Sequence, residues 1–191
     1  MIRLYFLVTF LGLYSSLPRE LIDGRVRCSV RDPTDEELSK QNRILKAKHN
    51  WKHKSPVGRT IGGPIDTFVH VIFDPITEQG FLSNTTVLKQ MQVLNDAFAD
   101  GKWEFVLRGI NYVGNESWIG LNGGSLEVEM KTMLRRGTAR TLNIYVIPEL
   151  AGYLGYATLP SDFAHNVLDD SIVLHTETLP GGSYVPVSYV D

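Results

Sequence analysis

Apolar residues from position 64 onward fall into short segments with strand spacing and longer segments with helix spacing. Four short segments, in which β-branched and aromatic residues alternate or run together, predict strands: Ile65–Phe73, Trp103–Val113, Leu142–Ile147 and Ile172–His175. A further segment, Gly152–Leu159, carries Gly and Tyr at close intervals and predicts another extended stretch. The pattern therefore predicts a sheet built from several short strands.

Two segments between these strands have apolar residues on one helical stripe or charges ordered as in a helix. Ser83–Asp100 carries such a stripe and predicts a helix. Ser83 or Asn84 can cap this helix, and Gly101 can end it. Ser125–Arg136 begins with acidic residues and ends with basic ones, as the helix dipole favours. A strand–helix–strand order implies a mixed, mostly parallel sheet with helices packed on it, so we expect an α/β (α+β) fold.

The chain begins with an apolar leader followed by a charged segment. Met1–Leu17 contains an uncharged apolar run that is too short to cross a bilayer, which is typical of a secretory signal peptide. A buried N-terminal strand or helix is the alternative. Residues 18–63 are expected to form a charged pro-segment or linker, in which Asp32 caps a helix that runs to about His49. Residues 64–191 are then expected to form the folded domain.

Charge and cysteine content narrow the class of protein. The formal net charge is −2, which argues against a protein that binds nucleic acid. Cys28 is the only cysteine, so no disulfide can form within the chain. Asn84 and Asn115 begin Asn-x-Thr/Ser sequons, which fit N-glycosylation of a secreted, extracellular protein. No segment after the leader could span a membrane, so no membrane anchor is expected once the signal peptide is removed.

The histidines do not form a recognisable metal-binding motif. A zinc-binding helix places two His four residues apart, with a Glu beside the first as the base. His49 and His53 have this spacing, but their segment is basic and no carboxylate lies between them. His70, in the middle of the first predicted strand, is expected to be a core histidine. His175 and Glu177 could form a carboxylate–imidazole pair, although a structural contact is preferred. The chain also lacks a G-x-S-x-G nucleophile elbow and a phosphate-binding loop.

Four segments, taken in order, resemble one family of secreted enzymes. They are Arg27-Cys28 followed by Pro33-Thr34 and Glu36-Glu37; the strand Ile65–Phe73; the run Gln92–Ala99 followed by Trp103 and Phe105; and the stretch Leu142–Ser183, especially Leu142-Asn143-Ile144-Tyr145, Leu154-Gly155-Tyr156-Ala157 and Leu179–Ser183. Together they are similar to the pappalysin-like (cytophagalysin) zinc metalloendopeptidases of the metzincin clan. The resemblance covers the chain from about Cys28 to Ser183.

The resemblance implies a metzincin-like upper subdomain, which is a mixed twisted sheet of about five strands with two backing helices. It also implies that Leu154–Leu159 is an antiparallel edge strand. An extended peptide or protein substrate would pair with the backbone of this strand, at Leu154, Gly155, Tyr156 and Ala157. An ordinary edge strand that is protected by a loop is the alternative.

The resemblance implies zinc as the cofactor, but it supplies no ligand for it. The family's motif, H-E-x-x-H-x-x-G-x-x-H, is absent from the 191 residues, so no catalytic or metal-binding residue is carried over. We therefore expect a sequence truncated before the zinc-binding helix, without the catalytic helix and the lower subdomain, and without proteolysis or tight zinc binding. In some relatives a pro-segment Cys thiolate ligates the zinc and silences the zymogen. Cys28 would take that role or pair with a cysteine outside this sequence.

Two functions from different classes follow from the resemblance. The first is proteolysis of extracellular proteins by a secreted zinc metalloendopeptidase, of which this sequence is the N-terminal part. The second is a non-catalytic secreted peptide-binding module, or decoy, that keeps the edge strand and lacks the zinc site. An unrelated secreted α/β domain is a third, weaker interpretation. A chain that is secreted, folded and resistant to proteases would favour the second function over an incomplete fragment.

Overall fold

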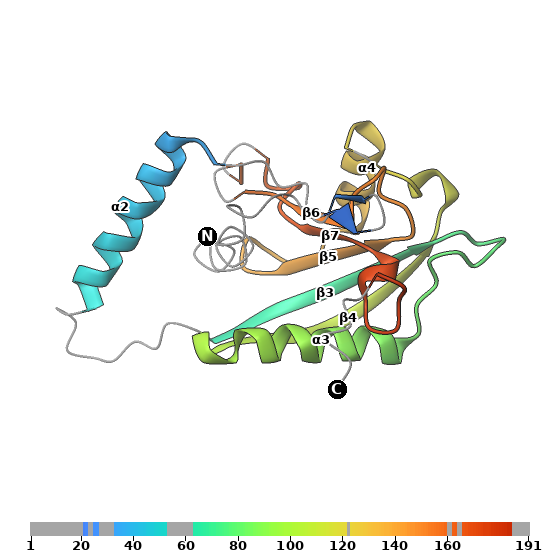
Figure 1. Ribbon diagram of the computed structural model, residues 1–191, viewed down its shortest axis with the longest axis horizontal. Coiled ribbons are helices and arrows are strands. Elements are labelled where there is room, and N and C mark those ends of the chain that lie inside the picture. The colour runs from blue at the N-terminus through green and yellow to red at the C-terminus, as the bar shows by residue number, and fades with distance from the viewer. Residues whose placement is uncertain are drawn as a thin grey trace.

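The structure is a computed structural model that describes residues 21–22, 25–26, 33–52, 63–121, 123–159, 162–163 and 166–184. Its helices and strands (Figure 1) are β1 (Leu21–Ile22), β2 (Arg25–Val26), α2 (Asp35–Lys52), β3 (Gly63–Phe73), α3 (Asn84–Phe98), β4 (Trp103–Gly114), α4 (Ser125–Leu134), β5 (Leu142–Ile147), β6 (Gly155–Ala157) and β7 (Ile172–His175). Three 3-10 turns are η1 (Ala99–Gly101), η2 (Glu116–Trp118) and η3 (Thr176–Thr178). The expected signal peptide and Cys28 lie outside the described residues, and the domain boundaries stay predictions.

Strands β3 to β7 form one sheet, in the order β4-β3-β5-β7-β6. β3 pairs in parallel with β4 and β5, β5 pairs in parallel with β7, and only β6 runs antiparallel. The predicted mixed, mostly parallel sheet is confirmed. β5 and β7 have their predicted bounds, because a continuous apolar run marks a strand that is covered on both faces. β6 is shorter than the predicted stretch Gly152–Leu159.

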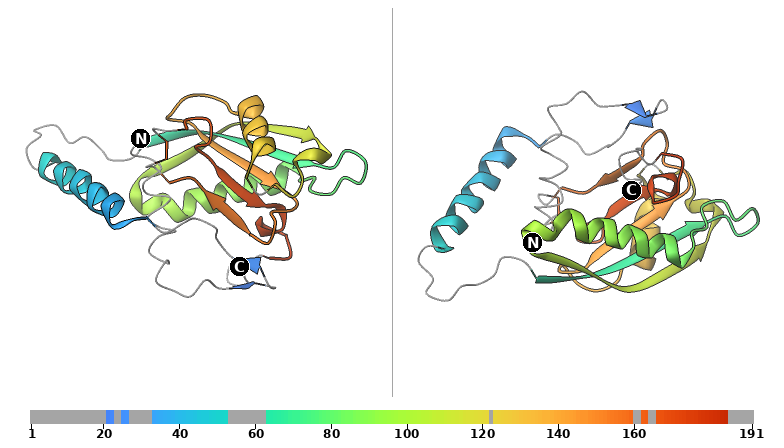
Figure 2. Two further views of the ribbon diagram at one scale, coloured as in Figure 1. Left: turned by 90° about the horizontal axis from the view of Figure 1, so that it is seen from above. Right: turned by 60° about the horizontal axis from the view of Figure 1, so that its bottom comes forward.

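The two helices α3 and α4 cover opposite faces of this sheet (Figures 1 and 2). Met91 of α3 belongs to the same core cluster as Val69 and Ile144. Met130 of α4 belongs to a second cluster, together with Tyr145. Ile144 and Tyr145 are neighbours in β5, and they lie in different clusters because successive side chains of a strand point to opposite faces. The expected pair of backing helices is therefore confirmed.

The start of α3 agrees with the prediction from the sequence, and its end does not. Ser83 is the cap, and its Oγ accepts a hydrogen bond from the backbone N–H of Thr86 at 3.1 Å. The expectation that Gly101 ends the helix is wrong, because η1 follows α3 and the left-handed residue is Lys102, with φ 56°. Gly101 is needed for space instead, since a Cβ there would lie 2.8 Å from Cδ1 of Trp103.

α2 confirms the helix expected in the charged segment, but its cap differs from the predicted one. The side-chain Oγ1 of Thr34 accepts from the Glu37 backbone N–H at 3.3 Å, and Glu37 Oε2 accepts from the Thr34 backbone N–H at 2.9 Å. This reciprocal pair is a capping box, so Thr34 takes the role predicted for Asp32. None of the helices in the described residues is both long and apolar enough to cross a membrane.

The outer edge of β4 is protected by side chains. The amide of Asn95 in α3 pairs with both backbone groups of Phe105: its Nδ2 donates to the carbonyl at 3.1 Å, and its Oδ1 accepts from the N–H at 2.7 Å. Further along, Arg108 is the extra residue of a bulge, and its Nε lies 2.7 Å from Oδ1 of Asp66. Bulges, charges and covered backbone groups all discourage a further strand from pairing with an edge.

Candidate peptide-binding edge

β6 lies at the end of the sheet opposite β4 and pairs only with β7 among the described strands. Gly155, Tyr156 and Ala157, three of the four residues expected to bind peptide, form β6, and Leu154 directly precedes it. The antiparallel edge strand implied by the resemblance is therefore confirmed, although it is shorter than Leu154–Leu159. Peptide binding by these four residues stays a prediction.

Two hydrogen bonds set the pairing of β6 with β7. The backbone N–H of His175 donates to the carbonyl of Leu154 at 2.9 Å, and the N–H of Thr158 donates to the carbonyl of Ser171 at 3.3 Å. In an antiparallel pair, every second residue directs its backbone groups to the partner strand. Tyr156 lies midway between Leu154 and Thr158, so its N–H and C=O also face β7.

The backbone N–H and C=O groups of Gly155 and Ala157 consequently face the outer edge of the sheet. Gly155 is buried and Ala157 is half-buried, so the Ala157 end of the strand is the more accessible one. Gly155 lies so close to β7 that a Cβ there would be 2.9 Å from the carbonyl oxygen of Val173. The absence of a side chain at Gly155 is therefore what lets β6 approach β7 so closely.

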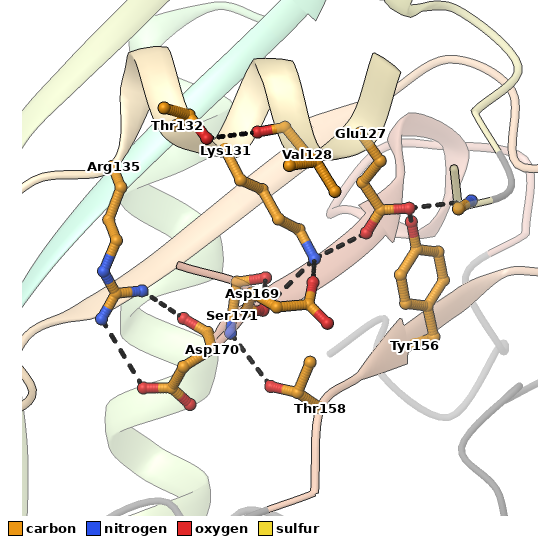
Figure 3. A network of polar contacts seen from close by, with 11 residues as sticks. Glu127, Val128, Lys131, Thr132, Arg135, Tyr156, Thr158, Asp169, Asp170 and Ser171 are labelled. Carbon is orange, nitrogen blue, oxygen red and sulfur yellow. Dashed lines mark hydrogen bonds and ion pairs between the residues drawn. The ribbon is translucent and has the colours of Figure 1, made fainter. Parts of the chain in front are cut away.

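The side chain of Tyr156 extends from β6 to Glu127 of α4 (Figure 3). The hydroxyl donates to Oε2 of Glu127 at 2.7 Å, and the backbone N–H of Gly123 donates to the same oxygen at 2.8 Å. The other carboxylate oxygen, Oε1, lies 2.6 Å from Nζ of Lys131. Burial, and then the neighbouring Glu127 carboxylate, raise the pKa of Tyr156, so its hydroxyl keeps the proton that it donates.

Lys131 of α4, and Arg135, which directly follows that helix, contact the segment that precedes β7 (Figure 3). Nζ of Lys131 contacts Oδ1 of Asp169 at 2.5 Å and the Asp169 carbonyl at 3.3 Å, and it lies 5.9 Å from the centroid of the Tyr156 ring. One turn later, Nη1 of Arg135 donates to the carbonyl of Asp170. Burial raises the pKa of the Asp170 carboxyl, and the Arg135 guanidinium partly offsets this effect.

His70 is a buried core histidine, as predicted. Its Nε2 lies 3.1 Å from Oδ1 of Asn143, and its ring stacks on Tyr145 with centroids 4.7 Å apart. The same Oδ1 accepts from the backbone N–H of Arg136, while Nδ2 of Asn143 donates to the Arg136 carbonyl. Oδ1 is thus an acceptor, so Nε2 of His70 carries the proton. Burial lowers the pKa of His70.

His175 and Glu177 are in contact, and the contact is structural. The backbone N–H of Glu177 donates to Nδ1 of His175 at 3.1 Å. The carboxylate of Glu177 turns to Ser183, accepting from its backbone N–H at 2.9 Å and from its Oγ at 3.0 Å. The backbone hydrogen bond from Ser183 is the main reason that the pKa of Glu177 is lowered. The Glu177 carboxylate therefore fixes the turn that follows η3.

The described residues do not fit a zinc site. Within them, no group of three or more His, Cys, Asp or Glu side chains is placed to hold a metal ion. Cys28, His53 and His165 lie outside the described residues, so the proposed zymogen role of Cys28 is untested. We therefore assign no zinc ligand and no zinc-dependent step to the described part of the chain.

The two sequon asparagines have different surroundings. Asn84 is exposed and is the first residue of α3, whose cap is Ser83. Asn115 is half-buried, and its Oδ1 accepts from the backbone N–H of Ser117 at 3.0 Å. Glycosylation of either residue remains a prediction.

Comparison with known proteins shows what the chain is related to. No protein-family model matches it. It is 30% identical over 173 residues to an extracellular metalloprotease of Pyricularia oryzae, an alignment that covers 88% of this chain and 60% of the relative. It is also 30% identical over 160 residues to an extracellular metalloprotease of Colletotrichum graminicola, covering 82% and 56% of the two chains. The chain is therefore similar in sequence to these two extracellular metalloproteases over most of its own length.

The chain spans less than two thirds of the length of either relative. Among solved structures, a promirolysin variant of Tannerella forsythia matches with a TM-score of 0.51 and 23% identity, over 80% of this chain and 60% of that chain. That likeness shows a shared fold. The expected relationship to secreted metalloproteases is confirmed. The catalytic activity of the whole protein stays a prediction.

The polar network under α4 was not expected from the sequence. Glu127 and Lys131 lie four residues apart in a predicted helix, which is the spacing of a helical ion pair. The sequence pattern alone could therefore have predicted this one contact. Asp169 is 38 residues from Lys131, and Tyr156 is 29 residues from Glu127. No local pattern connects residues so far apart, and only the folded chain brings them together.

Proposed function

We propose that the chain is part of a secreted zinc-dependent endopeptidase and supplies the strand along which an extended peptide or protein substrate is held. The observation that carries this proposal is the outward direction of the backbone groups of Gly155 and Ala157, on an edge strand of a chain homologous to extracellular metalloproteases. Backbone groups with this direction can pair with a peptide that adds one more strand to the sheet.

The residues of β6 would fix the register of such a peptide. A peptide strand would exchange hydrogen bonds with Gly155 and Ala157 on either side of Tyr156. The Tyr156 ring lies on the α4 side of the sheet, whereas Ala157 packs against the core on the α3 side. The backbone would therefore provide most of the attraction, and the described residues are assigned peptide binding rather than cleavage.

Replacing Ala157 with Pro tests this function. Proline removes the N–H that faces the outer edge, while the pairing of Leu154, Tyr156 and Thr158 with β7 needs no hydrogen bond from residue 157. We expect the full 191-residue chain to bind a fluorescein-labelled, proline-free library of unstructured peptides, and Ala157→Pro to weaken that binding about tenfold. Fluorescence anisotropy measures both affinities.

Ala157→Ser is the matched control, because it keeps the N–H and a small side chain. It should bind the peptides as the unchanged chain does. No binding by the unchanged chain, or equal affinity for the Ala157→Pro and Ala157→Ser variants, would contradict the proposal. Thermal unfolding of the three proteins separates a lost contact from a lost fold.

A further inference from the structure

One side chain of β6 forms a hydrogen bond to a helix on the face of the sheet. β6 has three residues and pairs along one side only. Strands this short have few backbone hydrogen bonds and open easily. Gly155 has no side chain, and Ala157 offers only a methyl group. Tyr156 is the residue of β6 whose side chain makes a hydrogen bond to another element.

The acceptor of that hydrogen bond is itself held firmly. Glu127 receives hydrogen bonds from the backbone of Gly123 and from Tyr156, and it is paired with Lys131. Glu127 and Lys131 are only 5% and 2% exposed, so water competes little for these contacts. Lys131 also forms an ion pair with Asp169, and this contact holds Lys131 against the segment before β7. The carboxylate is therefore in place before any peptide arrives.

We propose that Glu127 is a positioning residue for peptide binding, which holds β6 against β7 through the hydroxyl of Tyr156. The inference rests on the proposed function of β6. When the Tyr156 hydroxyl is bonded to Glu127, the backbone groups of Gly155 and Ala157 are fixed at the distance and angle that an added strand requires. Without that bond, β6 separates from β7 more often, and each peptide must first restore its position.

A purely structural role for the network would give a different result. Loss of an ordinary buried contact lowers the stability of the whole domain and affects β5 and β6 alike. Loss of an anchor that serves β6 loosens this strand selectively. Arg135 provides the matched control, because it directly follows the same helix and forms a buried contact with Asp170. Within the described part of the chain, its hydrogen bond and its ion pair both go to Asp170 and not to β6.

Hydrogen exchange in the free 191-residue chain provides the first readout. In the Tyr156→Phe and Glu127→Gln variants, we expect the amides of residues 156 and 158 to exchange about tenfold faster, while those of Ile144 and Val146 in β5 are unchanged. In the control, Arg135→Gln, the ratio of the amide exchange rates in β6 to those in β5 should be the same as in the unchanged chain. A uniform change in both strands, or no change, would overturn the proposal.

Peptide affinity provides the second readout, with the same labelled library. Both variants should bind more weakly, Tyr156→Phe by about tenfold. The double variant should be no worse than Tyr156→Phe alone, because Glu127→Gln weakens the same bond that Tyr156→Phe removes. Additive losses would show that Glu127 does not act through Tyr156. If Glu127→Gln fails to fold, Tyr156→Phe alone decides the matter. If the unchanged chain binds no peptide, the proposed function fails, while hydrogen exchange still decides whether Glu127 positions β6.

Discussion

His70 shows how a single buried residue can limit the pH range in which this sheet is stable. Its Nε2 proton is bonded to Asn143, and its Nδ1 has no hydrogen-bond partner among the described residues. A second proton would place a charge in the core, close to the positive Arg136, with no acceptor for it. The folded chain therefore favours the neutral imidazole.

Acidification is expected to destabilise the fold through His70. The folded-state pKa of His70 lies below the ordinary value of 6.5, so the unfolded chain binds more protons than the folded chain once the pH falls through that value. The free energy of unfolding should then fall, by at most about 1.4 kcal/mol per pH unit for this one group. Urea unfolding between about pH 8 and pH 5 measures the slope.

His70→Gln isolates this contribution, because glutamine does not titrate. The variant is expected to be less stable than the unchanged chain near neutral pH and to have a shallower dependence on pH below 6.5. Parallel curves for the two proteins would show that His70 is not the source of the acid sensitivity.

The two edge strands differ in how their backbone groups are occupied. At β4, the side-chain amide of Asn95 occupies the outward groups of Phe105, and Arg108 forms a bulge. At β6, the outward N–H and C=O groups of Gly155 and Ala157 have no neighbouring strand among the described residues. This asymmetry agrees with the proposal that a peptide strand adds at the β6 end of the sheet.

Asn95→Ala is expected to weaken the attachment of α3 to β4. It removes two hydrogen bonds and leaves the partly buried backbone groups of Phe105 unsatisfied, which costs about 1–3 kcal/mol of unfolding free energy. Gln92→Ala, at an exposed position of the same helix, should change that free energy by no more than about 0.5 kcal/mol. Equal effects in urea unfolding would exclude the role given to Asn95.

Sequence patterns located the strands and helices because apolar spacing is a local property. β5 and β7 were predicted to the residue, and Ser83 was one of two expected caps. The length of β6 and the end of α3 were predicted less well, because pairing with β7 and crowding at Trp103 are tertiary effects. The edge position of β6 came from family resemblance alone. The Glu127 network could not be predicted, since its partners come from separate elements.

At the scale of the whole molecule, the similarity to extracellular metalloproteases and the two sequons lead us to predict that the chain passes through a secretory pathway. Glycans would be tolerated by the fold at both sites. Asn84 is exposed outside the sheet. Among the described residues, the side chain of Asn115 is hydrogen-bonded through its Oδ1, so Nδ2 is the atom that would carry a sugar. Neither residue lies in β6, so we expect glycans there to leave the proposed peptide-binding edge free.

Expression of the full 191-residue chain in a eukaryotic secretory host tests this prediction. We expect the chain in the medium, with a mass that falls on treatment with an N-glycosidase. Asn84→Gln and Asn115→Gln should each remove one glycan, and the double variant should be insensitive to the enzyme. Peptide binding should be unchanged in all three variants, because the sequons and β6 lie on different elements. A secreted chain without glycans would refute both sites, and glycan-dependent peptide binding would contradict the separation of the two surfaces.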